Sequence, residues 1–228
     1  MRKICCFDAD GTLFDFEAAE ERALNMLMDY CSITKKDEAI EIYQEINHAL
    51  WKRLEQGTVT MERLKLERFE KFIETMNLSH QADELAQYFM DRLSEGNQLI
   101  QNAEETLKIL SNKYDCHIIT NGITRIQVSR LERSCIKPYI KHLFISEQLG
   151  VSKPNPAYFD AVKKTLNTSD DDLLIVIGDS LSSDMQGAIN SHLVSIWYNP
   201  SFLEVPSHMK IDAVIHDLSE LPDLIESL

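Results

Sequence analysis

Residues 4–15 read ICCFDADGTLFD, a short apolar run followed at once by two aspartates on a segment that contains a glycine. The run from Ile4 to Phe7 predicts a strand buried in a parallel sheet. Gly11 allows a tight turn, so Asp8 and Asp10 are expected on a loop at the carboxyl end of this strand. Ligands of open α/β sheets bind at that edge. The segment therefore predicts the first strand and a polar site at its end.

The second half of the chain repeats the pattern of a short apolar run followed by a helical pattern. Further strands are expected at residues 116–120, 143–145, 173–177, 194–198 and 213–215. Helices are expected near residues 123–133, 156–166 and 184–190, and another begins near Asn102, with Glu105 in a capping-box-like position. Strands and helices in alternation predict an α/β fold with a doubly wound parallel sheet.

The segment between Asp15 and Glu95 has a different composition. All six prolines lie at or after Pro138, Gly57 is the only glycine of this segment, and residues that favour helices dominate it. Apolar positions over residues 64–76 predict an amphipathic helix, and Gly57 separates it from an earlier helix around residues 40–54. The sequence thus predicts a helical cap, residues 15–96, inserted in an α/β core of residues 1–14 and 97–228.

Charge and cysteine usage narrow the partners and the compartment. A net charge of −14 argues against extended contact with a nucleic-acid polymer or an anionic membrane, because the phosphates would be repelled. No apolar stretch is long enough to span a bilayer. The five cysteines show no C-x-x-C spacing, which indicates reduced thiols and a cytoplasmic protein. No apolar stripe indicates a strong dimer, so a monomer or weak homodimer is expected.

The two aspartates of the first loop can divide the work of phosphoryl transfer. Asp8 is the candidate nucleophile, and Asp10 is the candidate general acid that protonates the leaving oxygen and later activates water. A turn that merely closes a strand is the simpler alternative. A calcium-binding EF-hand loop is another, but Thr12 occupies a ligand position and no helix precedes the loop.

Polar residues also follow the second strand and precede a later helix. Thr120 offers a hydroxyl, and Asn121 lies on an exposed turn, so both can bind phosphoryl oxygens, although Asn-Gly is also an ordinary turn signal. Lys153 lies on a loop that Pro154 stiffens. A lone lysine is usually a solvated surface residue, yet here it can orient the nucleophilic carboxylate and offset phosphate charge.

The fourth strand is followed by two further aspartates. Asp179 comes directly after the apolar run and Asp184 follows five residues later. Carboxylates in this position are candidate ligands for a hard metal ion. The alternative is that either residue only caps the next helix.

Taken together, these strand ends resemble the four motifs of the haloacid dehalogenase superfamily. The matching residues are Asp8 with Asp10, Thr120, Lys153, and Asp179 with Asp184. The resemblance covers essentially the whole chain and implies a phosphatase that forms an aspartyl-phosphate. It also implies that Mg²⁺ is bound by Asp8, the main-chain carbonyl of Asp10 and Asp179, with Asp184 nearby through water or Lys153.

Within that superfamily the chain is most similar to the pyrimidine 5'-nucleotidases. The residues that carry this similarity are Asp15-Phe16, Leu50-Trp51 followed by Gly57, Arg68-Phe69, Thr120-Asn121-Gly122 with Gln127 and Arg130-Leu131, and Trp197 with Asn199. Trp51 could stack on a base and Arg68 could bind the base or a phosphate, but an aromatic residue at helical spacing more often belongs to the core of a cap.

Three other functions stay open. A sugar-phosphate or phosphoglycolate-type phosphatase would share the core and differ in its cap. A metal-free 2-haloacid dehalogenase needs no acid at the position of Asp10, so that residue counts against it. A non-catalytic phosphate-binding protein would be expected to lack a nucleophile or a metal ligand, and here every matched position is present.

Overall fold

The computed structural model describes residues 2–228, which divide into two compact units. One unit comprises the residues up to Phe16 together with Asn97–Leu228, and the other comprises Glu17–Gly96. The cap and core boundaries drawn from the sequence stay a prediction. Over the described residues, no helix combines the length and the apolar character that a bilayer span requires.

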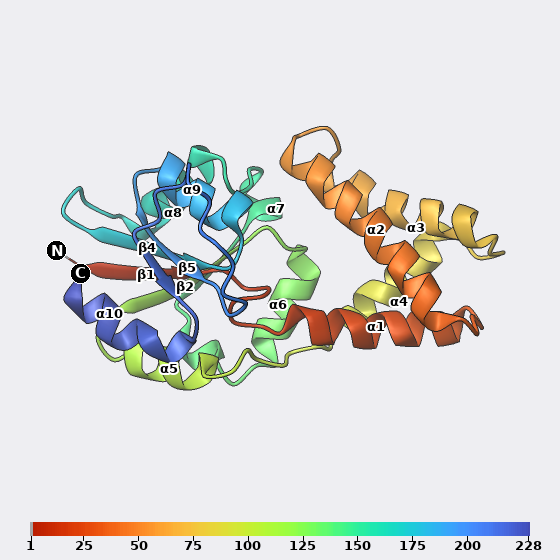
Figure 1. The fold of residues 1–228 in the computed structure, drawn as a ribbon, viewed down its shortest axis with the longest axis horizontal. Helices are drawn as coiled ribbons and strands as arrows, with labels where there is room; N and C mark the ends of the chain where they lie inside the picture. Colours follow the sequence, from red (N-terminus) through yellow and green to blue (C-terminus); the bar gives the residue numbers. More distant parts are fainter. Residues whose placement is uncertain (1) are drawn as a thin grey trace. The chain divides into compact units, whose positions relative to one another are not determined.

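The first unit is built on a six-stranded parallel sheet (Figure 1). Its order is β3-β2-β1-β4-β5-β6, so β1 lies in the middle although it comes first in the chain. The strands are β1 (Lys3–Phe7), β2 (Asp115–Thr120), β3 (His142–Ile145), β4 (Leu173–Gly178), β5 (Val194–Tyr198) and β6 (Ala213–Ile215). Each overlaps a strand predicted from the sequence, and the parallel α/β fold is confirmed.

Helices cover both faces of the sheet. They are α5 (Ala103–Leu110), α6 (Thr124–Glu132), α7 (Ser146–Leu149), α8 (Pro156–Leu166), α9 (Gln186–Asn190) and α10 (Leu221–Ser227). Successive side chains of a strand point to opposite faces. Cys5 and Phe7 of β1 therefore pack with α5 and α10, whereas Ile4 and Cys6 pack with α8 and α9. Both faces are thus buried, which explains the uninterrupted apolar runs of the strands.

One predicted helix cap and one predicted helix start need correction, although α5 begins beside Asn102 as expected. Asn102 does not begin a capping box, because it takes a left-handed conformation and its side chain donates to Asp217 at 2.8 Å. A true capping box forms at Asp217 itself, with Glu220 as its partner. The helix expected from Asp184 begins instead with a π-helical turn, Leu181–Met185, before α9.

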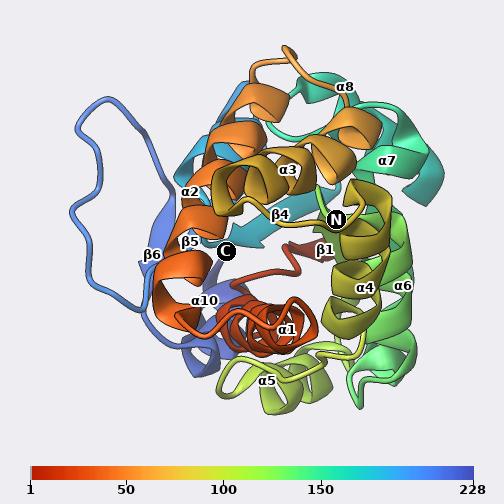
Figure 2. The ribbon, with the colours of Figure 1, turned by 90° about the vertical axis from the view of Figure 1, so that its right-hand side faces the viewer.

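The second unit is helical throughout, as expected for this segment (Figures 1 and 2). Its helices are α1 (Phe16–Tyr30), α2 (Lys36–Glu55), α3 (Met61–Met76) and α4 (Ala82–Leu93). α3 packs against both α2 and α4. The core of this unit is aromatic, since the ring centroids of Tyr43, Phe69 and Phe89 lie 5.3 to 5.7 Å from one another. Thr60 caps α3 by accepting from the main-chain N–H of Arg63, which marks the break after Gly57.

One buried side chain of the sheet is poorly satisfied. His117 in β2 is 1% exposed, and neither of its ring nitrogens has a hydrogen-bond partner among residues 2–228. Its ring stacks on His142 of the neighbouring strand, with 5.3 Å between centroids. Burial, together with the charge of His142, lowers the pKa of His117 to about 4. The folded protein therefore holds this imidazole neutral.

Replacing His117 with phenylalanine is expected to raise the free energy of unfolding by about 1 kcal/mol near neutral pH, because an unpaired buried polar ring is removed. Between the folded pKa of about 4 and the unfolded value of 6.5, the unfolded chain binds more protons, so wild-type stability falls as the pH falls. The variant should lose part of this dependence in urea unfolding. An unchanged slope with pH, or the same effect from changing the exposed His142 to glutamine, would contradict the explanation.

Candidate functional site

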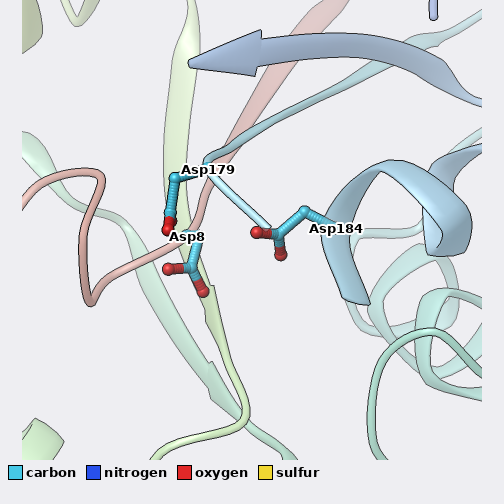
Figure 3. Close-up of side chains that lie close together, drawn as sticks. All are labelled: Asp8, Asp179 and Asp184. Atoms are coloured by element: carbon cyan, nitrogen blue, oxygen red, sulfur yellow. The ribbon is translucent and has the colours of Figure 1, made fainter. Parts of the chain in front are cut away.

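Three carboxylates meet at the carboxyl ends of β1 and β4 (Figure 3). Asp8 follows β1, where its main-chain N–H continues the ladder by donating to Ile177 at 2.8 Å. Asp179 follows β4, and Asp184 lies on the π-helical turn beyond it. One oxygen from each of the three lies within 4.8 Å of the others. Adjacent central strands thus bring together residues that are about 170 positions apart in the sequence.

A buried lysine lies among these carboxylates. The Lys153 ammonium donates to Oδ1 of Asp8 and to Oδ1 of Asp184, each at 2.6 Å, and to the main-chain oxygen of Ile119 at 3.0 Å. All three protons of the ammonium therefore have acceptors, and the side chain is only 1% exposed. The surface-lysine alternative is excluded for Lys153 by this burial.

Burial and mutual repulsion set the protonation of the cluster. Burial raises the pKa of Asp8 well above its usual range, which Lys153 opposes and Asp184 reinforces. The pKa of Asp179 is raised to about 6 by burial and by Asp184. Burial alone would lower the pKa of Lys153, but Asp184 and Asp8 raise it, so the lysine stays charged. Three carboxylates against one ammonium leave two negative charges in a largely buried space when all are ionised.

This donor set fits a divalent cation such as Mg²⁺. Hard cations prefer carboxylate oxygens, and the excess negative charge of the cluster matches the charge of such an ion. Asp8, Asp179 and Asp184 are the side chains of the described residues that could hold it. The site therefore passes a chemical test for the predicted metal, on donor type and on charge.

Neighbouring groups hold Asp179 and Asp184, two of the three candidate metal ligands, in place. The Thr12 hydroxyl donates to Oδ1 of Asp179 at 2.9 Å, and the indole N–H of Trp197 donates to the Asp179 main-chain oxygen at 2.8 Å. Gly178 is required by close approach, because a Cβ there would lie 2.3 Å from Oδ2 of Asp184. The glycine thus admits the Asp184 carboxylate beside the strand.

The loop after β2 joins the same site. The Thr120 hydroxyl accepts from the main-chain N–H of Gly122 at 2.9 Å, so its own proton can be donated to a phosphoryl oxygen. The side-chain amide of Asn121 donates to the Lys153 main-chain oxygen at 2.9 Å and accepts from the Lys153 N–H at 3.0 Å. The Asn121 side chain thus ties this loop to the lysine loop, and its expected contact with substrate stays a prediction.

Sequence reasoning named Gln127 and Arg130 only for their family resemblance and gave them no role. Both side chains bind the carboxylate of Asp10, which is turned toward α6 and is not part of the three-carboxylate cluster. Tyr158 was missed entirely. Its hydroxyl accepts from the Thr120 N–H at 3.0 Å and donates to Phe144 at 2.9 Å, a role that no local pattern signals.

The two candidate substrate residues of the helical unit differ in their surroundings. Trp51 of α2 is partly exposed. Arg68 of α3 is 2% exposed and donates from Nη1 to Oδ1 of Asn47 at 3.2 Å. Its guanidinium lies about 5 Å from the ring centroids of Phe69 and Phe89. Over residues 2–228 its Nε and Nη2 have no hydrogen-bond partner, so these two nitrogens of the buried guanidinium are unsatisfied donors.

Comparison with known proteins identifies relatives over nearly the whole chain. The profile of haloacid dehalogenase-like hydrolases matches residues 2–192. The pyrimidine 5'-nucleotidase PynA of Streptococcus pneumoniae is 32% identical over 225 residues, which cover 98% of this chain and 95% of that protein. The pyrimidine 5'-nucleotidase YjjG of Escherichia coli is 32% identical over 219 residues, 96% of each chain. The magnesium-bound crystal structure of the HAD-hydrolase YfnB from Bacillus subtilis superposes with a TM-score of 0.89 at 31% identity, covering 98% of each chain.

Replacing Lys153 with methionine is expected to lower the free energy of unfolding by about 3 kcal/mol, because Asp8 and Asp184 lose the cation buried between them. Added Mg²⁺ should raise the melting temperature of the variant more than that of the wild type, since the ion supplies the missing charge. Calorimetry with excess EDTA and with Mg²⁺ measures both effects. The matched control is Lys164→Met at an exposed position. An equal loss in that control would disprove the role of Lys153.

Proposed function

The chain belongs to the haloacid dehalogenase-like hydrolase family, and from that premise we propose that it is a Mg²⁺-dependent phosphatase acting on pyrimidine nucleoside monophosphates through an aspartyl-phosphate. The observation that carries the proposal is the bond from the buried Lys153 to Asp8 beside two further carboxylates. This contact holds one aspartate in a defined orientation next to a site suited to a divalent ion. Such an arrangement suits a nucleophile better than a structural turn.

The proposed reaction has two displacements at phosphorus. In the first, an oxygen of Asp8 attacks, the bond to the ester oxygen breaks, and Asp10 gives its proton to the leaving alcohol. In the second, water attacks the same phosphorus, the bond to Asp8 breaks, and Asp10 accepts the water proton. Inorganic phosphate leaves and both aspartates regain their starting states.

The remaining residues hold the phosphoryl group and its charge. We propose that the Thr120 hydroxyl donates to a phosphoryl oxygen and that the Lys153 ammonium, beside Asp8, offsets the phosphoryl charge, with Asn121 fixing the spacing of their two loops. Bound Mg²⁺, held by Asp8, the main-chain carbonyl of Asp10, Asp179 and, through water or Lys153, Asp184, would neutralise phosphoryl charge. Positioning and charge stabilisation are most of what this reaction requires.

The relatives support a nucleotide as substrate. PynA and YjjG are both named pyrimidine 5'-nucleotidases, and each matches this chain nearly end to end. A small phosphate monoester also suits a chain of net charge −14, because a single phosphate can be met by local positive groups such as Lys153. A monomer or weak homodimer, and a cytoplasmic location, stay predictions from the sequence.

The test of this function is phosphate release from nucleoside monophosphates, sugar phosphates and phosphoglycolate, with Mg²⁺ and with excess EDTA. We expect Mg²⁺-dependent release that favours pyrimidine monophosphates. A preference for a sugar phosphate would keep the mechanism and change the substrate class. No release from any ester would favour the dehalogenase or the non-catalytic binding protein.

The nucleophile is tested within the same assay. Asp8→Asn is expected to lower turnover by at least about 1,000-fold, because the amide cannot attack phosphorus, while the circular dichroism spectrum stays that of the wild type. Retained turnover in this variant would refute the covalent mechanism.

The helical unit supplies the candidates for contact with the base. Trp51 and Arg68 stay proposals, and the unpartnered buried donors of Arg68 support a contact with a carbonyl or phosphate oxygen. Leaving such donors without a partner is costly, and a ligand oxygen would remove that cost in this helical core.

Arg68→Leu is expected to raise the KM for a pyrimidine monophosphate by about 10-fold and to leave the KM for p-nitrophenyl phosphate, which lacks the base, within about twofold. Steady-state kinetics on both esters measure the difference. The matched control is Arg63→Leu, an exposed position on the same helix. If both esters lose equally, Arg68 has only a structural role.

A further inference from the structure

The carboxylate of Asp10 is bound at both of its oxygens by side chains of one helix. Gln127 donates from Nε2 to Oδ2, and Arg130 donates from Nη1 to Oδ1. Residues three positions apart lie on the same face of a helix, so both donors reach the carboxylate from α6. A carboxylate on a loop is thus fixed in position and in rotation.

The two donors are themselves immobilised by packing. Arg130 is fully buried, and its guanidinium carbon lies 4.8 Å from the centroid of the Phe14 ring. Gln127 is 2% exposed and lies against Gly122, where a Cβ would come within 2.3 Å of its Nε2. Gly122 therefore makes room for the glutamine amide. The Thr120 loop thus packs against the Asp10 clamp, the pair of side chains Gln127 and Arg130 that bind Asp10.

The start of α6 is also held in place. Ile123 provides no side-chain cap, and a carboxylate oxygen of Glu147, from α7, accepts from the main-chain N–H of Thr124 at 2.8 Å instead. A negative charge at this end also interacts favourably with the positive N-terminal end of the helix dipole. α6 is therefore anchored at its first turn before it presents the two donors.

The side chains of Arg130 and Asp10 differ in their exposure to solvent, which bears on the role of the pair. The Arg130 side chain is 0% exposed, whereas that of Asp10 is 26% exposed. Removing one partner of an ion pair is most costly when the other partner stays buried, so Arg130 depends on Asp10 for its charge partner. Here a buried cation binds a carboxylate that stays partly exposed to solvent.

We propose that Arg130 and Gln127 are positioning residues for the reaction, which hold the Asp10 carboxylate where it can exchange a proton with the leaving oxygen and with the attacking water. The inference rests on the proposed function. A proton transfer requires heavy atoms within hydrogen-bond reach, and displacements of about 1 Å can cost on the order of 100-fold in rate. Neither residue needs to touch the substrate for this role.

The decisive experiment is a double-mutant cycle between Asp10 and Arg130. Arg130→Met is expected to lower kcat by about 100-fold with KM within about threefold, because only the proton transfers lose their alignment. Asp10→Asn should cost more, about 1,000-fold. In the Asp10→Asn background, Arg130→Met should cost less than about threefold further, since the group it positions is already gone.

Burst kinetics with p-nitrophenyl phosphate show whether Arg130→Met only misplaces Asp10 or disrupts the whole site. The nitrophenolate leaving group needs little protonation, so Asp8 of the Arg130→Met variant should still be phosphorylated. Hydrolysis of the aspartyl-phosphate, which needs the base, should be slow. We therefore expect a burst of one nitrophenolate per enzyme followed by a slow steady state. A disrupted site would instead lose the burst amplitude.

Three further variants keep the test decisive if Arg130→Met folds poorly. Gln127→Leu keeps the apolar packing and removes one donor, and it should show the same burst with a smaller loss of kcat. Arg130→Lys keeps the charge without the planar fork and should recover part of the rate. Ile126→Ala is the matched control, a buried α6 residue outside the clamp, and it should lower stability without producing a burst.

The two levels of proposal fail in different ways. An inactive wild-type protein on every ester overturns the proposed function and this inference with it. An active wild type in which the losses from Asp10→Asn and Arg130→Met multiply overturns the inference alone. A rise in KM with kcat unchanged would instead make Arg130 a substrate-binding residue, which also contradicts it.

Discussion

The buried ammonium of Lys153 is the contact on which the rest of the site depends. It binds Asp8 and Asp184 at once and takes its third acceptor from the main chain of the strand before Thr120. Without a cation at this point, three carboxylates in a largely buried space would repel one another or take up protons. One lysine therefore orients the candidate nucleophile and opposes the rise in its pKa, while the remaining carboxylates leave a place for a divalent ion.

The parallel sheet explains why these residues can meet at all. Its order places β1 between β2 and β4, so the segments after these three strands open at the same edge. The loop that carries Lys153 follows β3 and α7, and the double bond between Asn121 and the Lys153 main chain ties it to the end of β2. The lysine and the threonine thus reach the same edge of the sheet although they come from different strand connections.

The strands, the helical segment and the candidate site residues could be predicted from the sequence, because each is indicated by the residue types of a short segment. Short apolar runs of three to five residues indicated all six strands, and the absence of proline with a single glycine indicated the helical segment. Local signals failed where a competing contact existed, as at Asn102, whose side chain binds Asp217 instead of capping its own helix. Motif order at the strand ends was sufficient to name the candidate carboxylates and the lysine, although their catalytic roles stay proposals.

The sequence alone determined which residue types follow which strands, because strand and turn preferences act over a few neighbouring positions. Only the tertiary structure decided how those residues are paired. Nothing local to Arg130 indicates that it is buried with its guanidinium on Asp10, and nothing local to Asn121 indicates that its amide is used by Lys153. Such contacts join residues 32 or 120 positions apart. They form only when the chain folds into its tertiary structure, because burial then favours pairing of polar groups that lie far apart in the sequence.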